Sequence, residues 1–294
     1  MHIILGATGH IGSELSRLLL ARGEPLTVVS RSEDKLQALR ALGADAARVD
    51  VRDVQALRAV FRQGRRLFLL NPPAAPTTDT DREERATLKA ILEALEGSGL
   101  ERIVAVSAFG AQAGEHIGDL GVLHEMEQGL ARQPVPVSIV RGAYYFTNWD
   151  MALQGAQEQG VVPSFFPADF RLPMVDPRDL AEAAADLMTA SEDRPGLFQV
   201  EGPQRYAPAD VAAACAAVLG RPVRVEEVPR ARWVETFRGF GFSPSAAESY
   251  ANMTALTIDG TFPDPAGTLH GKTSLQNYIT ERCSRTPARP PHQP

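Results

Sequence analysis

Three glycines near the amino terminus have a spacing that can hold a phosphate group. They fall in Gly6-Ala7-Thr8-Gly9-His10-Ile11-Gly12, between an apolar run at 3–5 and an amphipathic segment at 11–22. The first glycine permits a tight turn, the second lets the backbone approach a pyrophosphate, and the third lets a helix pack on a sheet. The first turn of such a helix offers free N–H groups to an anion. The residues expected to line a dinucleotide are Gly6, Thr8, Gly9, His10, Ile11 and Gly12; the alternative is a tight turn that binds nothing.

The end of the second apolar run indicates which dinucleotide is bound. NAD sites place a carboxylate there for the ribose hydroxyls, but this chain reads Val29-Ser30-Arg31-Ser32. Arg31 can pair with a 2′-phosphate, which predicts NADP(H) in preference to NAD(H), unless it is an ordinary solvated arginine. Asp50, after the third run, is expected either to accept a hydrogen bond from the adenine amino group or to cap the next helix. Asp53 is a second candidate for that cap.

Apolar strand-like runs alternate with amphipathic helical segments over the first 142 residues. The strands are expected at 3–5, 26–29, 46–49, 67–70, 103–106 and 135–140, and the helices at 11–22, 33–42, 53–61, 80–97 and 120–132. This order predicts an α/β fold with a doubly wound parallel sheet of the Rossmann type over residues 1–150. Residues 151–284 are expected to form a smaller α/β substrate-binding part, interleaved with the first. Residues 285–294 read as a disordered tail.

Several of these motifs together resemble the NmrA-like branch of the atypical short-chain dehydrogenase/reductases. They are the glycine loop, Ser30-Arg31, Asp50, the strand Ile103–Ala108 and a segment reading His124-x-x-x-Gln128. The resemblance extends to about residue 280, and within the branch the chain looks most like NAD(P)H-dependent quinone and triphenylmethane-dye reductases. It implies a dinucleotide-binding fold and hydride transfer to a small molecule.

The catalytic pair typical of that superfamily, Tyr-x-x-x-Lys, is absent. None of the five tyrosines is followed four residues later by one of the three lysines. By resemblance, His124 takes the place of the tyrosine and Gln128 that of the lysine, so His124 is a candidate proton donor and Gln128 a candidate ribose ligand. Ser107 matches the serine that orients substrate. The alternatives are that His124 packs beneath the cofactor and that Ser107 satisfies local backbone.

Aromatic side chains follow the strands at the edge where ligands bind in open α/β sheets. The residues expected to form a substrate pocket for a flat, apolar molecule are Phe109, Tyr144, Tyr145, Phe146 and Trp149. Such aromatic density is also typical of simple core packing. Asn71 and Pro72, after the fourth strand, are expected to shape the pocket beside the cofactor.

Composition excludes several other classes of protein. The 294 residues include 44% hydrophobic and 22% charged residues, with a formal net charge of −6 and no long basic run, so nucleic acid is not an expected partner. The two cysteines lie far apart and the six histidines are scattered, which predicts neither a disulfide scaffold nor a metal site. No apolar stretch is long enough for a membrane span. We expect a cytoplasmic protein.

Two functions remain open at this level. The first is an NADPH-dependent oxidoreductase that passes hydride to a small flat electrophile such as a quinone, dye or enone. Such acceptors take hydride at an electrophilic centre, so water can supply a later proton. The second is a non-catalytic NADP(H)-binding redox sensor that acts through a protein partner, which the missing tyrosine favours. An isomerase is disfavoured by the same loss. The expected assembly is a monomer or homodimer.

Overall fold

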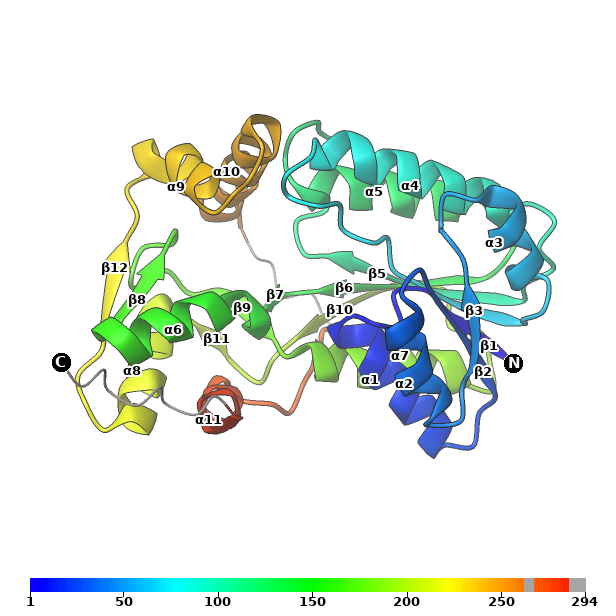
Figure 1. Cartoon of the computed structure of the whole chain (residues 1–294), viewed down its shortest axis with the longest axis horizontal. Helices are drawn as coiled ribbons and strands as arrows, with labels where there is room; N and C mark the ends of the chain where they lie inside the picture. The colour runs from blue at the N-terminus through cyan, green and yellow to red at the C-terminus, as the bar shows by residue number, and fades with distance from the viewer. Residues whose placement is uncertain (262–266, 286–294) are drawn as a thin grey trace.

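The computed structural model describes residues 1–261 and 267–285, and a parallel eight-stranded sheet forms its centre (Figure 1). The strand order is β13-β10-β6-β5-β4-β1-β2-β3, and every neighbouring pair is parallel. The strands are β1 (His2–Ile4), β2 (Leu26–Ser30), β3 (Asp45–Arg48), β4 (Arg66–Leu69), β5 (Arg102–Ala108), β6 (Val137–Gly142), β10 (Gly196–Glu201) and β13 (Leu269–His270). The order reverses between β1 and β4, the point at which ligands bind in such sheets. The predicted doubly wound α/β fold is confirmed.

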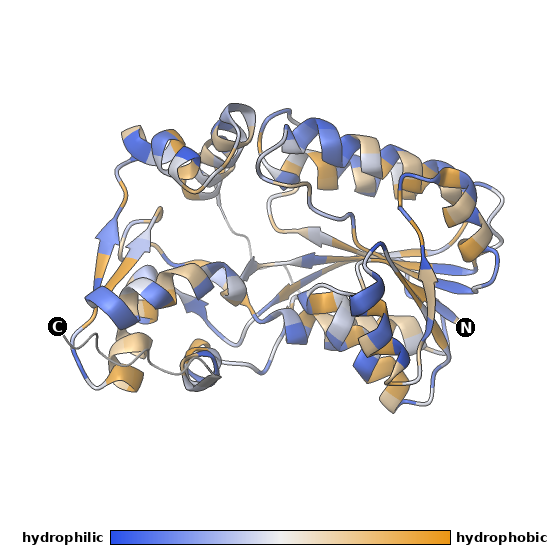
Figure 2. Ribbon diagram, in the orientation of Figure 1, coloured by the Kyte–Doolittle hydropathy of each residue, from blue (hydrophilic) through white to orange (hydrophobic). Residues whose placement is uncertain are grey.

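Helices cover both faces of this sheet. One face carries α1 (His10–Ala21), α2 (Glu33–Arg40) and α7 (Pro177–Thr189), and the other carries α3 (Val54–Phe61), α4 (Thr80–Leu95) and α5 (Asp119–Ala131). Their apolar sides face the sheet and their polar sides point outward (Figure 2). Side-chain caps fix where several of them begin: Asp53 accepts from the Ala56 amide and Asp79 from the Arg82 amide. Asp53, rather than Asp50, is therefore the cap of α3.

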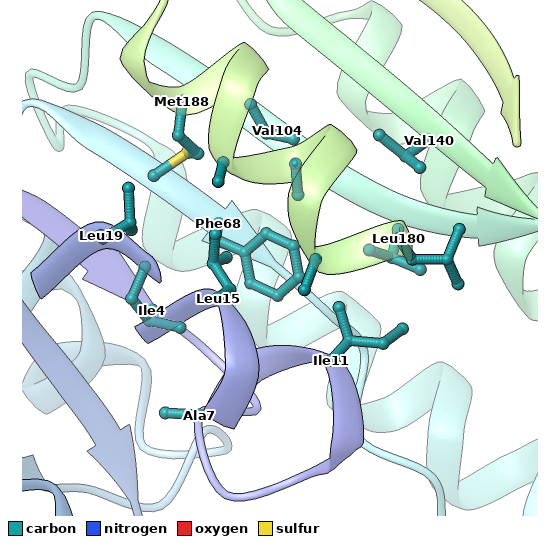
Figure 3. Packing of buried hydrophobic residues seen from close by; sticks show 14 of the residues in the cluster. Ile4, Ala7, Ile11, Leu15, Leu19, Phe68, Val104, Val140, Leu180 and Met188 are labelled. Carbon is teal, nitrogen blue, oxygen red and sulfur yellow. The ribbon is translucent and has the colours of Figure 1, made fainter. Parts of the chain in front are cut away.

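Two hydrophobic cores hold the helices to the sheet. On one face Phe68 of β4 packs with Ile11 and Leu15 of α1 and with Leu180 and Met188 of α7 (Figure 3). On the other face the apolar stripes of α4 and α5 pack against the alternate side chains of β1, β4 and β5. Because the strands are parallel, the first turns of α4 and α5 both lie at the carboxyl edge of the sheet. Residues near the starts of these helices therefore face the ligand-binding edge.

The remaining elements build a smaller part beside the sheet. Its strands are β7 (Tyr144–Tyr145), β8 (Val161–Ser164), β9 (Leu172–Val175), β11 (Arg205–Tyr206) and β12 (Arg224–Glu227). They pair as β11-β9-β7 and β12-β8. Its helices are η1 (Phe146–Trp149), α6 (Asp150–Gln159), α8 (Pro208–Leu219), η2 (Arg230–Arg232), α9 (Trp233–Gly239), α10 (Pro244–Asp259) and α11 (Leu275–Arg285).

The chain passes between the two parts more than once. After the first small strands it returns to the sheet as α7 and β10, and later as β13. Strand β12 pairs in parallel with β8. The expected tail at 285–294 lies, apart from its first residue, outside the described residues. No helix in the described part of the chain is long and apolar enough to cross a membrane.

Candidate functional site

The glycine loop has the backbone geometry that a pyrophosphate cradle requires. Gly6 has a φ of +67°, which disfavours any residue with a Cβ. A Cβ on Gly12 would lie 2.3 Å from the Gly6 carbonyl oxygen, so α1 packs against the loop only with glycine there. Gly9 is the N-cap of α1 and offers no side-chain cap, and a Cβ on it would meet nothing closer than 3.5 Å. The first amides of α1 are therefore free to bind an anion above Gly9.

Two arginines lie at the carboxyl ends of the neighbouring strands β2 and β3. Arg31 follows β2 and is exposed, and Arg48 ends the neighbouring strand β3 opposite Ser30. Arg48 Nε donates to the Arg31 carbonyl oxygen at 3.3 Å. Neither guanidinium forms an ion pair within the described ranges, so both charges remain for a ligand. Asp50 is exposed and accepts from the Arg52 amide at 3.0 Å, which fixes the turn before α3.

The loop after β4 is tied to the first turns of α4. Asn71 Nδ2 donates to the Glu84 carbonyl oxygen at 3.3 Å, and the Ala74 amide donates to Glu84 Oε1 at 2.9 Å. Asn71 Oδ1 is buried without a hydrogen-bond partner in the described structure. Pro72 is half-buried beside it. This loop adjoins β1 and its glycine turn, because β4 and β1 are neighbours in the sheet.

Ser107 is engaged with a buried ion pair. It is 1% exposed, and its hydroxyl donates to Glu127 Oε1 at 2.6 Å. Arg141 holds the same carboxylate through Nε at 2.8 Å and a second nitrogen at 2.6 Å. Because the hydroxyl proton is directed at Glu127, Ser107 can offer a substrate only its oxygen lone pairs in this arrangement.

His124 and Gln128 lie one turn apart on α5, beside Glu127, whose carboxylate contacts Ser107. His124 is half-buried and Gln128 is exposed. Helical geometry puts both well away from the inward stripe that contains Val122 and Met126. No hydrogen bond of the His124 ring occurs in the described part of the molecule, so its side chain is uncommitted.

The aromatic residues predicted to form the pocket divide into two groups. Phe146 and Trp149 are buried in the core of the smaller part, where Phe146 packs against Tyr206 and Tyr278. Phe109, Tyr144 and Tyr145 keep part of their surface exposed. The Tyr144 ring stands edge-on to Trp149, with centroids 6.0 Å apart, so the buried tryptophan supports the tyrosine above it.

Two carboxyl groups near the starts of α4 and α5 were not predicted from the sequence, and of these Glu84 is buried whereas Asp119 is half-buried. Glu84 is 4% exposed, and Asp119 Oδ1 is buried with no partner among the described residues. Burial and the nearby charge of Asp119 raise the pKa of Glu84 to about 8. Burial also raises the pKa of Asp119, and Asp119 in turn adds to the raised pKa of Tyr145 and Tyr250.

Helix α10 closes this side of the site. It packs against α4 and lies beside the starts of α4 and α5 (Figure 1). The Gly118 amide donates to Ser249 Oγ at 2.8 Å, and Asn252 Nδ2 donates to the His116 carbonyl oxygen at 3.1 Å. At its first turn Ser243 bonds the loop after β4 through its amide and its hydroxyl. The helix thus fastens both loops that flank the two carboxyl groups.

The sequence pattern marks Glu84 and Asp119 as unusual, although they were not predicted to belong to the site. Glu84 continues the spacing of Leu88 and Ile91, and Asp119 that of Val122 and Met126, so each acid lies on a core-facing stripe. An acid at such a position is unusual enough to mark a site. Among the described residues no three metal-binding side chains gather.

Comparison with known proteins agrees with this geometry. A family model described as NAD(P)H-binding matches residues 6–133. The NAD(P)H azoreductase of Xenophilus azovorans is 26% identical over 287 residues, which cover 97% of this chain and 95% of that protein.

Solved structures show the same fold over the whole chain. The NADPH-dependent quinone oxidoreductase of Escherichia coli, complexed with NADPH, has a TM-score of 0.81 at 21% identity, covering 96% of this chain and 99% of that one. The triphenylmethane reductase of Citrobacter sp., complexed with NADP(H), has a TM-score of 0.79 at 19% identity with the same coverage. Residues 6–133 are therefore similar to the NAD(P)H-binding family, in a chain that is similar over nearly its full length to proteins named as NAD(P)H-dependent reductases.

Proposed function

We propose that the protein is an NADPH-dependent oxidoreductase that reduces small, flat electrophiles such as quinones, dyes or enones without a Tyr-x-x-x-Lys pair. One observation carries the proposal: the glycine cradle after β1 and the half-exposed Tyr144 and Tyr145 after β6 meet the same carboxyl edge, with the Asn71 loop between them. The similarity to an azoreductase over 97% of the chain supports the same reaction class.

Each part of the site has a physical role in this reaction. The α1 amides and Gly9 bind the pyrophosphate, and Arg31 with Arg48 binds the 2′-phosphate. These contacts extend the dinucleotide from β3 across β1 toward Asn71 and β5. The bound cofactor supplies a hydride. The tyrosines hold a flat acceptor against it by stacking, so proximity and orientation provide most of the acceleration.

His124 is the residue at which a catalytic role suggested by the resemblance is best tested. Of the two catalytic candidates that the resemblance suggests, His124 has a side chain without a hydrogen bond in the described structure, whereas the Ser107 hydroxyl donates to Glu127. We propose that His124 contacts the substrate or the nicotinamide end of the cofactor. His124→Ala is then expected to lower kcat with an unchanged Kd for NADPH, and an unchanged kcat would remove His124 from the site.

The first experiment is stopped-flow oxidation of bound NADPH at 340 nm against a panel of quinones, azo and triarylmethyl dyes and enones. NADH serves as the cofactor control. Saturable turnover with NADPH supports the proposal. Tight NADPH binding with no oxidation by any acceptor would contradict it, and would favour a redox sensor that acts through a protein partner.

A further inference from the structure

A reductase of this kind must deliver a proton as well as a hydride to most of its acceptors. A quinone that has accepted hydride carries a negative oxygen, and a reduced azo group carries a negative nitrogen. The tyrosine that supplies this proton in related enzymes is absent here. A protein group that is protonated near neutral pH and close to the substrate edge would deliver this proton faster than water does.

Glu84 and Asp119 are brought to that edge by two neighbouring helices. Glu84 lies one turn before Leu88 on the inward stripe of α4, and Asp119 lies one turn before Val122 on the inward stripe of α5. Both stripes pack on the same core, and both helices begin at the carboxyl edge of the sheet. The two acids thus lie where the stripes begin, near the carboxyl edge of the sheet.

Neither acid has a positively charged partner among the residues that the structure describes. Glu84 accepts one hydrogen bond, from the Ala74 amide, and Asp119 Oδ1 accepts none in the described structure. Glu127 gives the contrast within the same site, because its buried carboxylate has both Arg141 and Ser107. A buried carboxyl without a counter-ion is more stable as the neutral acid.

The other groups around the pair do not neutralise it. Asp81, on the same helix, is held by Arg85 and by the His116 amide. Tyr145 comes from β7 and Tyr250 from α10, and both contribute neutral phenols. The raised pKa of Glu84, about 8, agrees with this environment.

We propose that Glu84 and Asp119 together hold the proton that completes the reduction. This inference rests on the proposed hydride transfer. A carboxyl O–H bond breaks, and an O–H or N–H bond forms at the substrate atom that became negative when hydride arrived. The carboxyl pair then takes a proton from solvent. In the overall reaction, NADPH, the acceptor and one proton give NADP⁺ and the acceptor reduced by two electrons.

A comparison of two acceptors distinguishes proton donation by these acids from a purely structural role. A cationic triarylmethyl dye needs only hydride, because the product is neutral, whereas a quinone needs hydride and a proton. Glu84→Gln and Asp119→Asn are expected to lower kcat for the quinone by about 100-fold, as loss of a general acid does, and to leave kcat for the dye within about twofold. Glu93→Gln, an exposed acid on the same helix, is the matched control and keeps both rates.

A second measurement needs neither cofactor nor turnover. The cofactor-free protein is expected to show an infrared band of a protonated carboxyl that persists at neutral pH, disappears as the pH passes about 8 and is missing in Glu84→Gln. Absence of this band in the wild type would overturn the inference even if a variant failed to fold. Equal loss of quinone and dye turnover in both acid variants, or selective loss of quinone turnover in His124→Ala instead, would overturn it as well. If the wild type oxidises no NADPH with any acceptor, the proposed function fails, whatever the carboxyl titration shows.

Discussion

The hydroxyl of Ser107 donates to Glu127 Oε1 at 2.6 Å, in a site where Arg141 donates to both oxygens of the same carboxylate. All three residues lie between β5, α5 and β6, directly below the carboxyl edge. A serine that resemblance assigns to substrate thus has a defined partner within the protein. The arrangement predicts how Ser107 contributes to stability.

Ser107→Ala is expected to lower the free energy of unfolding by about 2 kcal/mol, because a hydrogen bond to a buried charge is lost. The double variant Ser107→Ala/Glu127→Gln should be less destabilised than the sum of the two single variants, since Ser107→Ala removes the hydrogen bond and Glu127→Gln removes the charge that strengthens the same bond. Urea denaturation gives the free energy of unfolding of the two single variants and the double variant. Strict additivity would show that the hydroxyl does not stabilise Glu127.

Substitutions at two glycines of the loop are expected to separate its role in cofactor binding from its role in folding. Gly9→Ala has room for its Cβ in the protein but places it where the phosphate approaches, so we expect at least tenfold weaker NADPH binding and an unchanged Tm. Gly12→Ala has no such room, because its Cβ would lie 2.3 Å from the Gly6 oxygen, and should lower Tm as well. Fluorescence titration and thermal unfolding give the two values. Gly239→Ala, with nothing nearby, is the control, and a Gly9→Ala variant with native affinity would contradict the cradle.

The glycine loop and the parallel sheet could be predicted because each depends on local spacing and strand order. Three glycines between a strand and a helix impose one turn, and apolar runs separated by helices impose a parallel sheet. What Ser107, Glu84 and Phe146 contact could not be predicted in this way. Those contacts depend on Glu127, Asp119 and Tyr206, which the chain brings near only after folding.

Arg48 is another residue whose position could not be predicted from the sequence, in this case at the proposed cofactor site. It lies 17 residues from Arg31, and only the pairing of β2 with β3 brings the two residues to one end of the sheet. We expect Arg48→Gln to weaken NADPH binding about tenfold and to leave NADH binding unchanged, because only NADPH carries the 2′-phosphate. Isothermal titration with both cofactors checks this. Arg132→Gln, an exposed arginine after α5, controls for net charge, and an equal loss for NADH would contradict the assignment.

The buried acid Glu84 predicts an unusual dependence of stability on pH. Glu84 keeps its proton up to about pH 8 in the folded protein but releases it near its ordinary value of 4.5 when unfolded. The folded state therefore binds more protons between these values, and stability falls as pH rises through this window. We expect the Tm of the cofactor-free protein to fall from pH 6 to pH 9, and Glu84→Gln to flatten that decline. Glu93→Gln should retain the wild-type slope, and an identical slope in Glu84→Gln would mean that Glu84 is already ionised at neutral pH.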